Sequence, residues 1–548
     1  MSRTIEGFRG ERPIVAPGLL QDNEATDTLD VRIEGGKVFS MHNNLHVRPQ
    51  TTGATLKSIY PYGGNWFEWE GDVDATETQI GADAYNRVIF TGDGAPKVTY
   101  TALATTGSQP FPSSSYLLGT PPPGYIAGSF DFGQAITGNV TGTPDDPDDL
   151  VDTRFYVATS VDIFGAEGPP CLVSSAFEWQ PGQTVNLTIP AEASGNYNIT
   201  GWRLYRTSTG SSSTEFQYVK DGTGTATTDS TGADDLVEVL TTEDYNLPNP
   251  NMIGITAMPG AYLAGFYDNI LFFSEPGYPH AWPIGYQLNT KTPIVGIKVI
   301  SQNTILVTTT EKPYIAVGTD PANMSLSSLD DILEANASKR SMADVGPGVV
   351  FASPDGLIMV GTSGTRNLTE QIFSRAQWQA MDPTSMQCFY HEGTCLVTWE
   401  NITASTEGTF AINPSAPEGG IVRISGHIDG GHYAGETDLL YLSKDGNIEV
   451  YDEGATWRDG MWRSKLFEHK SPSTFSAARI WGEFLGTVRL TLGTGVREFF
   501  SRIMPDSRPH RLQGGQKRAA INVKLNLTDG QTIHRVELAE SMSELRGG

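Results

Sequence analysis

Short runs of alternating apolar and polar residues recur along most of the chain and are separated by Gly, Asn, Asp and Pro. In the run NWFEWEG, Trp66 and Trp69 fall on opposite faces of an extended segment, while Phe67 and Trp69 share one face. Dipeptides such as Gly35-Gly36 and Asn43-Asn44 tolerate positive φ and favour hairpin turns. This pattern predicts an all-β protein.

The runs group into repeated units. Residues 55–105 predict four short antiparallel strands, which together have the size of one β-propeller blade. Units with the same order of apolar run, turn and second apolar run return after residue 255. A single unit cannot bury both of its faces, but radial stacking can, so we expect a propeller-like body of about six blades. The later units span 261–277, 294–320, 345–364, 385–415 and 432–454.

Two stretches carry a helical period. Residues 325–339 place Leu326, Leu329, Ile332 and Leu333 at helical spacing. In residues 373–383, Ser374 and Gln377 have the spacing of a capping box, and Pro383 ends the segment. We expect both stretches to be helical connectors between blades.

Composition and turn spacing divide the rest of the chain. The segment before the first blade has no sustained period and is expected to be an extended arm. A block between the first and second blades is similar to a fibronectin type III sandwich in its RLYRT strand, its EGPP turn and its size. The last segment predicts a two-sheet sandwich. The expected domains are an arm at 1–54, a first blade at 55–110, an inserted fibronectin type III-like domain at 115–250, the remaining blades at 255–456 and a C-terminal β domain at 457–548.

Composition and charge narrow the function. The 60 Gly and 33 Pro fit a turn-dense chain, and a formal net charge of −26 excludes a general basic nucleic-acid coat and disfavours an anionic membrane. Three cysteines, Cys171, Cys388 and Cys395, form no CxxC motif and suit a reducing compartment. For Cys388 and Cys395, two buried thiols on neighbouring strands are favoured over a redox or metal pair. No run of 18 apolar residues and no apolar N-terminal core is present, so we expect neither a membrane span nor a signal peptide.

Motifs for nucleotide, acyl or metalloprotease chemistry are missing from the sequence, and no cofactor is expected. Two clusters could in principle hold a metal, but a solvated loop is favoured for each. The segment DEGATW at 452–457 looks like the Asp-box turn of sialidase-type propellers, with Val450 where Ser is expected, and this motif supports a fold more than an activity. The clusters are His427, Asp429, His432, Glu436 and Asp438, and Asp145, Asp146, Asp148, Asp149 and Asp152.

The C-terminal segment differs in charge from the rest. Residues 457–548 hold 15 basic and 9 acidic residues, a net of +6. These basic side chains could contact phosphate or pair with the acidic body of a neighbouring subunit, and the overall negative charge favours subunit pairing. The candidate interface residues are Arg497, Arg502, Arg508, Arg511, Lys517 and Arg518.

Several longer strings resemble structural tail proteins of short-tailed bacteriophages, and the closest class is the tail nozzle or hub protein. The resemblance covers most of the chain, although the inserted sandwich departs from the simplest nozzle proteins. The strings lie at 44–49, 60–75, 91–99, 272–283, 312–325, 338–357 and 536–545.

This resemblance implies a non-enzymatic homo-hexameric ring that continues the DNA ejection channel below the portal and adaptor. It also implies contacts with tail adaptor and fibre or spike proteins, and a place in the virion tail after assembly in the bacterial host cytoplasm. Double-stranded DNA would pass without specific binding, because an acidic wall does not gain affinity by neutralising phosphates. Two other functions stay open: a receptor- or glycan-binding tail protein and a glycan-cleaving propeller enzyme.

Overall fold

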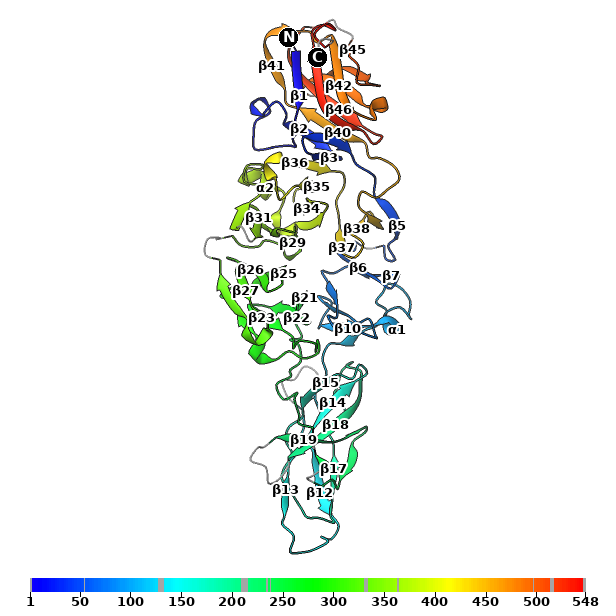
Figure 1. Cartoon of the computed structure of the whole chain (residues 1–548), viewed down its shortest axis with the longest axis vertical. Helices are drawn as coiled ribbons and strands as arrows, with labels where there is room; N and C mark the ends of the chain where they lie inside the picture. Colours follow the sequence, from blue (N-terminus) through cyan, green and yellow to red (C-terminus); the bar gives the residue numbers. More distant parts are fainter. Residues whose placement is uncertain are drawn as a thin grey trace.

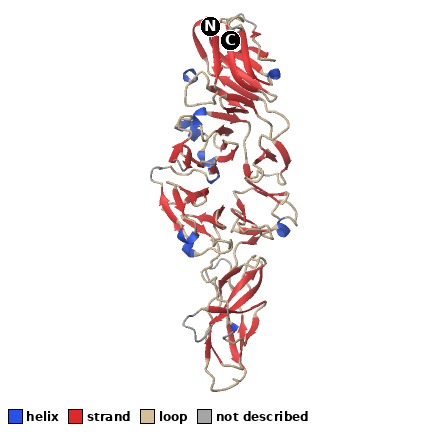
Figure 2. Ribbon diagram, in the orientation of Figure 1, coloured by secondary structure: helices blue, strands red, loops and turns tan. Residues whose placement is uncertain are grey.

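The computed structural model shows an elongated molecule in three parts, drawn along its long axis in Figure 1. A sandwich that contains the first and last strands lies at one end, a ring of small sheets lies in the middle, and a second sandwich lies at the far end. Strands dominate all three parts (Figure 2). The structure describes residues 2–53, 55–126, 133–207, 215–232, 235–236, 238–329, 334–361, 364–495, 497–512 and 517–545.

The middle part is a propeller-like ring. It contains six four-stranded antiparallel sheets and one two-stranded hairpin, β6 (Ser58–Tyr62) with β7 (Asn65–Trp69). The first strand of each sheet lies beside the first strand of the next sheet, which closes the ring. The six sheets are β8 (Asp74–Glu77), β9 (Val88–Thr91), β10 (Lys97–Thr99) and β11 (Tyr116–Leu117); β21 (Ile253–Met258), β22 (Tyr262–Tyr267), β23 (Ile270–Phe273) and β24 (Leu288–Asn289); β25 (Ile294–Ser301), β26 (Thr304–Thr309), β27 (Tyr314–Val317) and β28 (Ser325–Ser328); β29 (Ala343–Asp344), β30 (Gly348–Ser353), β31 (Gly356–Gly361) and β32 (Gly364–Asn367); β33 (Gln387–His391), β34 (Thr394–Asn401), β35 (Thr406–Ile412) and β36 (Ile421–Ile424); and β37 (Gly430–Ala434), β38 (Leu439–Lys444) and β39 (Asn447–Val450) with β5 (Leu45–Pro49).

The predicted single blade at 55–105 is wrong, because its strands belong to two different sheets. The Ser58 hydroxyl accepts the Val73 N–H at 2.9 Å and donates to the Gly71 carbonyl at 3.0 Å. These bonds hold the segment that follows β7 beside β6 before β8 begins. As a result, β8 starts a new sheet and β7 does not pair with β9. The predicted faces of the NWFEWEG strand are confirmed, because Phe67 packs edge-on against Trp69 at 5.8 Å while Trp66 packs on Tyr441.

The N-terminal segment is not a free arm, which corrects the expectation for residues 1–54. Its strand β5 completes the last sheet of the ring by pairing with β39, with Arg48 opposite Ile448. Its first four strands belong to the C-terminal sandwich, because Ile5, Val31 and Val38 are apolar and fully buried there.

The sandwich at this end consists of two six-stranded sheets around one core. One sheet has the order β3-β4-β47-β42-β45, with β1 also on β47. The other has the order β2-β40-β46-β43-β44, with β41 also on β46. Its strands are β1 (Ser2–Glu6), β2 (Ala25–Leu29), β3 (Val31–Glu34), β4 (Lys37–Ser40), β40 (Gly460–Ser464), β41 (Phe467–Ser473), β42 (Ala477–Glu483), β43 (Arg489–Thr494), β44 (Arg497–Ile503), β45 (His510–Arg511), β46 (Arg518–Leu527) and β47 (Thr532–Ala539).

The far part is the inserted sandwich, with sheets ordered β12-β17-β20 and β15-β14-β18-β19 and a short pair, β13 with β16. Its core holds Tyr156, Val185 and Trp202. The strands are β12 (Thr137–Thr141), β13 (Asp152–Arg154), β14 (Tyr156–Asp162), β15 (Glu167–Pro170), β16 (Phe177–Trp179), β17 (Thr184–Thr188), β18 (Ile199–Thr207), β19 (Phe216–Gly222) and β20 (Ala226–Asp229).

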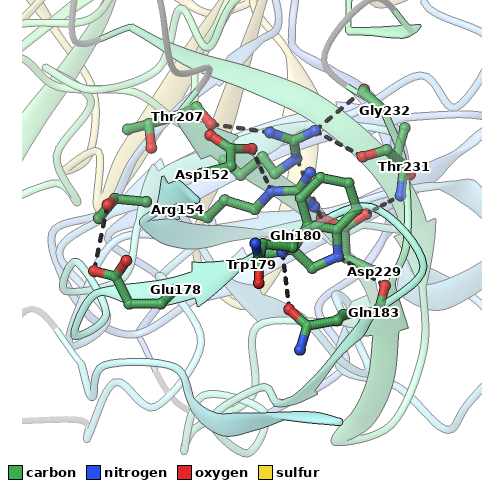
Figure 3. Close-up of polar contacts among 12 residues, drawn as sticks. Asp152, Arg154, Glu178, Trp179, Gln180, Gln183, Thr207, Asp229, Thr231 and Gly232 are labelled. Carbon is green, nitrogen blue, oxygen red and sulfur yellow. Dashed lines mark hydrogen bonds and ion pairs between the residues drawn. The ribbon is translucent and has the colours of Figure 1, made fainter. Parts of the chain in front are cut away.

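A network of charged side chains is buried beside this core. Arg154, Arg206 and Asp229 are fully buried. The Asp229 carboxylate lies 3.4 Å from Nη1 of Arg154 and 3.2 Å from Nε of Arg206, and it accepts the Tyr156 hydroxyl at 2.7 Å. Figure 3 shows Asp152 and Asp229 around the Arg154 guanidinium. Because buried charges are tolerated only when they are paired, this network fixes how the strands that carry it pack.

Helices are few and short. The predicted capping box is confirmed, because Ser374 and Gln377 exchange side-chain to backbone bonds at the start of α2 (Arg375–Ala380). The prediction of a helix at 325–339 is wrong at its start, where Ser325–Ser328 extends the sheet by pairing with β27, and Ile332 and Leu333 lie outside the described residues. None of the helices in the described part of the chain could cross a membrane. The remaining helices are α1 (Thr101–Ala104), η1 (Pro17–Leu19), η3 (Ile284–Tyr286), η4 (Pro321–Asn323), η5 (Lys339–Ser341), η6 (Pro383–Ser385), η7 (Pro417–Gly419) and η8 (Leu485–Thr487).

Candidate assembly interface

Two end strands of the C-terminal sandwich, β44 and β45, follow each other in the chain. Strand β44 pairs only with β43 and ends its sheet, and β45, next in the chain, ends the other sheet by pairing with β42. The opposite edge strand, β2, is covered, because Glu11 accepts the Thr28 N–H and the Arg423 carbonyl accepts the Asp30 N–H. The side formed by β44 and β45, here called the free edge, therefore presents unpaired backbone groups that another chain could use.

The free edge gathers the predicted basic residues. Arg497 and Arg502 lie on β44, Arg508 on the following loop and Arg511 on β45, and all four are exposed. Nη1 of Arg502 donates to the Arg511 carbonyl at 2.5 Å, which ties the two edge strands together. The sequence prediction therefore selected side chains that the fold places on one side of one domain.

The other two predicted residues lie at the start of β46. Arg518 places its guanidinium 5.1 Å from the ring centre of Phe499 on β44, and Lys517 precedes it and is exposed. In the described part of the chain, no carboxylate lies within 4.0 Å of the following basic groups: Arg497, Arg502, Arg508, Arg511 and Lys517. Five cations are therefore available for an acidic partner.

Sequence reasoning missed the apolar residues of this edge. Phe499 is 39% exposed and Ile503 is 43% exposed, so two large apolar side chains stand among the arginines. The run REFFSRI contains three apolar residues, but their spacing is not the period of two that indicates a half-buried strand, so the sequence carried no clear signal for this edge. Exposed apolar groups beside unpaired cations are the mixture that protein interfaces use.

Charge is distributed unevenly along the long axis. Residues 1–44 and 457–548, which form the terminal sandwich, hold 20 basic and 16 acidic residues, a net of +4. Residues 119–245 hold 4 basic and 18 acidic residues, a net of −14, and the remaining residues, which form the ring, carry −16. The free edge is therefore on the terminal sandwich, which is the one of the three parts with a net positive charge.

The candidate metal clusters do not assemble. No group of three or more possible ligands that could hold a metal ion occurs within the ranges that the structure describes, and these ranges include both clusters. Nδ1 of His427 lies 3.0 Å from the Thr398 hydroxyl, His432 packs edge-on against Tyr60, and Asp438 accepts the Tyr433 hydroxyl at 2.7 Å. The side chains therefore have separate local partners.

The interpretation of the cysteines as buried thiols is confirmed. Cys388 lies on β33 and Cys395 on the neighbouring β34, and all three cysteines are free and buried. Contact with Cys395 and burial raise the pKa of the Cys388 thiol well above its usual value. A raised pKa keeps this thiol protonated and therefore unreactive at neutral pH.

The Asp-box-like segment holds the N-terminal segment in place. Oδ1 of Asp452 accepts the His42 N–H at 2.6 Å, and Oδ2 of Asp452 pairs with Arg32. Trp457 stacks on His42 with ring centres 3.6 Å apart. The Asp452 carboxylate therefore accepts a backbone N–H from a distant segment of the chain.

No family model and no curated protein matches the chain. Similar solved structures include the extracellular domain of a hybrid two-component system from B. thetaiotaomicron, at 10% identity over 63% of this chain and 43% of that chain, with a TM-score of 0.27. Virginiamycin B lyase from Staphylococcus aureus is 10% identical over 70% of this chain and 99% of that chain, with a TM-score of 0.26. BBS1N in complex with ARL6DN is 11% identical over 74% and 96%, with a TM-score of 0.28. These likenesses are too distant to bear on function.

Proposed function

We propose that this protein is a structural component of a bacteriophage tail, a ring of identical subunits that continues the DNA ejection channel and docks other tail parts. The observation that carries the proposal is the free edge, which presents unpaired strand backbone, exposed apolar side chains and unpaired arginines on an otherwise acidic molecule. The resemblance of the sequence to tail nozzle and hub proteins is the reason for assigning this ring to a bacteriophage tail.

The free edge suits a neighbouring copy of the same chain. A heterologous contact, in which one surface meets a different surface of the next copy, generates a closed ring when its rotation closes. The cations at Arg497, Arg502 and Arg511 would meet acidic side chains of that copy, and Phe499 and Ile503 would lose water contact. A ring of six such subunits is the state that the resemblance implies.

The net charge suits the passage of DNA. A wall that neutralised phosphates would release counterions and bind the duplex, whereas an acidic wall gains no such affinity. The ring and the inserted sandwich together carry −30, since the terminal sandwich carries +4 of the total of −26. These acidic parts are the surfaces that would face the duplex in the assembled tube.

Mass photometry and negative-stain electron microscopy of the purified full-length protein test this proposal. We expect closed rings with a central pore, and we expect the double variant Arg497→Glu and Arg502→Glu to remain folded but monomeric, because like charges would then face the acidic neighbour. The control Lys291→Glu reverses an exposed charge on the ring and should leave the assembly unchanged. A wild-type protein that stays monomeric at high concentration, or a double variant that still forms rings, would contradict the proposal.

A further inference from the structure

A cavity, here called the channel, lies in the middle of the ring, where the first strands of the sheets and the hairpin strand β6 meet. Its volume is about 560 Å³, which is within the range of small-molecule sites. Side chains from β6, β8, β21, β25, β29, β33 and β37 line it. The channel lies in a different domain from the free edge, so binding of a ligand there is independent of the proposed function.

Four cations line the channel. Two of them, Lys339 and Lys57, are either paired with carboxylates or exposed to solvent. Nζ of Lys339 lies 3.0 Å from Asp72 and also contacts Asp74, and these two carboxylates raise the pKa of the Lys339 ammonium although burial lowers it. Lys57, which also lines the channel, is exposed. Neither group requires a ligand.

The other two cations, Arg340 and Lys298, are only partly exposed, and no carboxylate in the described part of the chain lies within 4.0 Å of either. Nη2 of Arg340 donates to the Lys57 carbonyl, but its Nη1 is buried without a hydrogen-bond partner. Burial lowers the pKa of Arg340, against the attraction of Asp72 and Asp74. Because no carboxylate pairs with either cation, a ligand that supplies an anionic acceptor at the channel wall would gain free energy.

Aromatic rings stand beside these cations. Tyr60 packs edge-on against His432 with ring centres 4.9 Å apart, and Tyr390 and Tyr433 also line the channel. Burial, together with the charge of Lys298, lowers the pKa of His432 to about 4, so its ring is neutral at neutral pH and can accept or donate a hydrogen bond. Asp344, also on the channel wall, adds an acceptor for hydroxyl groups.

We propose that the channel binds a small hydroxylated organic anion, a sugar acid or a sugar phosphate, with its anionic group between Arg340 and Lys298 and its ring against the tyrosines. An arginine fork matches both carboxylate and phosphate oxygens, so both anions are included in the class. The neutral His432 and the carboxylate of Asp344 would take the hydroxyl groups. The volume of the channel admits one or two sugar rings.

Isothermal titration calorimetry of the full-length protein with four probes tests this inference. The probes are glucuronate, glucose 6-phosphate, neutral glucose and inorganic phosphate. We expect at least one of the two anionic sugars to bind. Glucose and phosphate should bind roughly tenfold more weakly or not at all, because glucose lacks the anionic group and phosphate lacks the sugar ring. Glucuronate alone binding would assign a carboxylate site, and glucose 6-phosphate alone would assign a phosphate site.

Variants locate the binding. Arg340→Gln and Lys298→Gln, made separately, should each weaken the anionic sugar by roughly tenfold or more, because each removes a charge-assisted bond. Lys291→Gln, an exposed lysine seven positions before Lys298, is the matched control and should not change binding. Lys298→Gln keeps the test valid if Arg340→Gln fails to fold. Absence of binding of both anionic sugars at millimolar concentration, or equal binding by glucose, would overturn the inference.

Discussion

The guanidinium carbon of Arg154 lies 3.4 Å from the ring centre of Trp179, although Arg154 is fully buried. The same guanidinium contacts Asp152 at 2.8 Å and Asp229 at 3.4 Å (Figure 3). One solvent-shielded site in the inserted sandwich therefore holds the Trp179 indole, the two carboxylates and both arginines, Arg154 and Arg206. The balance of charge in this site depends on Asp229, which contacts both arginines.

Asp229→Asn should destabilise the inserted sandwich by about 3–5 kcal/mol, because it leaves two buried arginines with too little negative charge. Thermal unfolding of the full-length protein, followed by limited proteolysis within 119–245, would measure the loss. Asp221→Asn removes a carboxylate that is 64% exposed and pairs with Arg203, so it should cost less than about 1 kcal/mol. An equal loss of stability in the two variants would mean that the buried network does not stabilise the inserted sandwich.

Closure of the ring by β5 can be tested with a disulfide. His46 on β5 lies opposite Glu449 on β39, and directly opposed residues of antiparallel strands are close enough for a disulfide. His46→Cys with Glu449→Cys should raise the melting temperature when oxidised, by the equivalent of up to about 5 kcal/mol, because the crosslink closes a very long loop. The reduced double variant is the control. No difference between its oxidised and reduced forms would mean that β5 is not held on the ring.

Two buried titratable groups at the joint between the ring and the inserted sandwich should affect stability with opposite signs. Burial raises the pKa of Asp162 to about 6, and it lowers the pKa of His280 to about 4. Both groups line one small cavity at this joint. The folded state therefore favours protonated Asp162 and neutral His280.

For Asp162, the stabilising effect is present below pH 4 and is lost as the pH rises through about 6. For His280, it is present above about pH 6.5 and is lost as the pH falls toward 4. Asp162→Asn should therefore gain stability relative to wild type as the pH rises from 5 to 8, by about 1–1.5 kcal/mol, since the rest of the effect is lost below pH 5. Melting temperatures of both proteins across this range give the measurement, and parallel curves would refute it.

The junction between the terminal sandwich and the ring depends on a close approach at Gly10. The Gly10 N–H donates to the Gly419 carbonyl at 2.7 Å, and a Cβ at this position would overlap the Ile421 carbonyl oxygen. Gly10→Ala should therefore cost about 1–3 kcal/mol through forced backbone movement. Gly18→Ala is the control, because nothing lies within 4 Å of its added carbon. If the melting curves of the two variants coincide, the close approach of Gly10 to the Ile421 carbonyl does not constrain the junction.

The sequence was sufficient for local structure. Period-two alternation identified β7 and its faces, and the positive φ of Gly35 and Gly36 agrees with the hairpin turn predicted there. The capping box at Ser374 was also recognisable, because it depends on residues three positions apart. Such features are determined by neighbours in the chain, so a single sequence contains them.

Long-range pairing could not be predicted in the same way. Residues 2–49 show no sustained period, and their strands form because partners such as Ala539 and Ile448 lie opposite them. Helical spacing at Leu326 and Leu329 was outweighed by pairing with β27. Basic composition identified the arginines of the free edge, but the exposed Phe499 and Ile503 became apparent only from the sheet order.

The pairing of Ser2 with Ala539 and of Arg48 with Ile448 has a consequence for biosynthesis. At about 5–20 residues per second, a ribosome needs roughly 20–80 seconds to make the 400 residues between Arg48 and its partner. During that time β1, β2 and β5 have no partner strand in the chain made so far and resemble aggregation-prone segments. The inserted sandwich, whose described strands all lie between Thr137 and Asp229, and the ring sheets made of consecutive strands can complete their pairing before the C-terminal partners of the N-terminal strands are made.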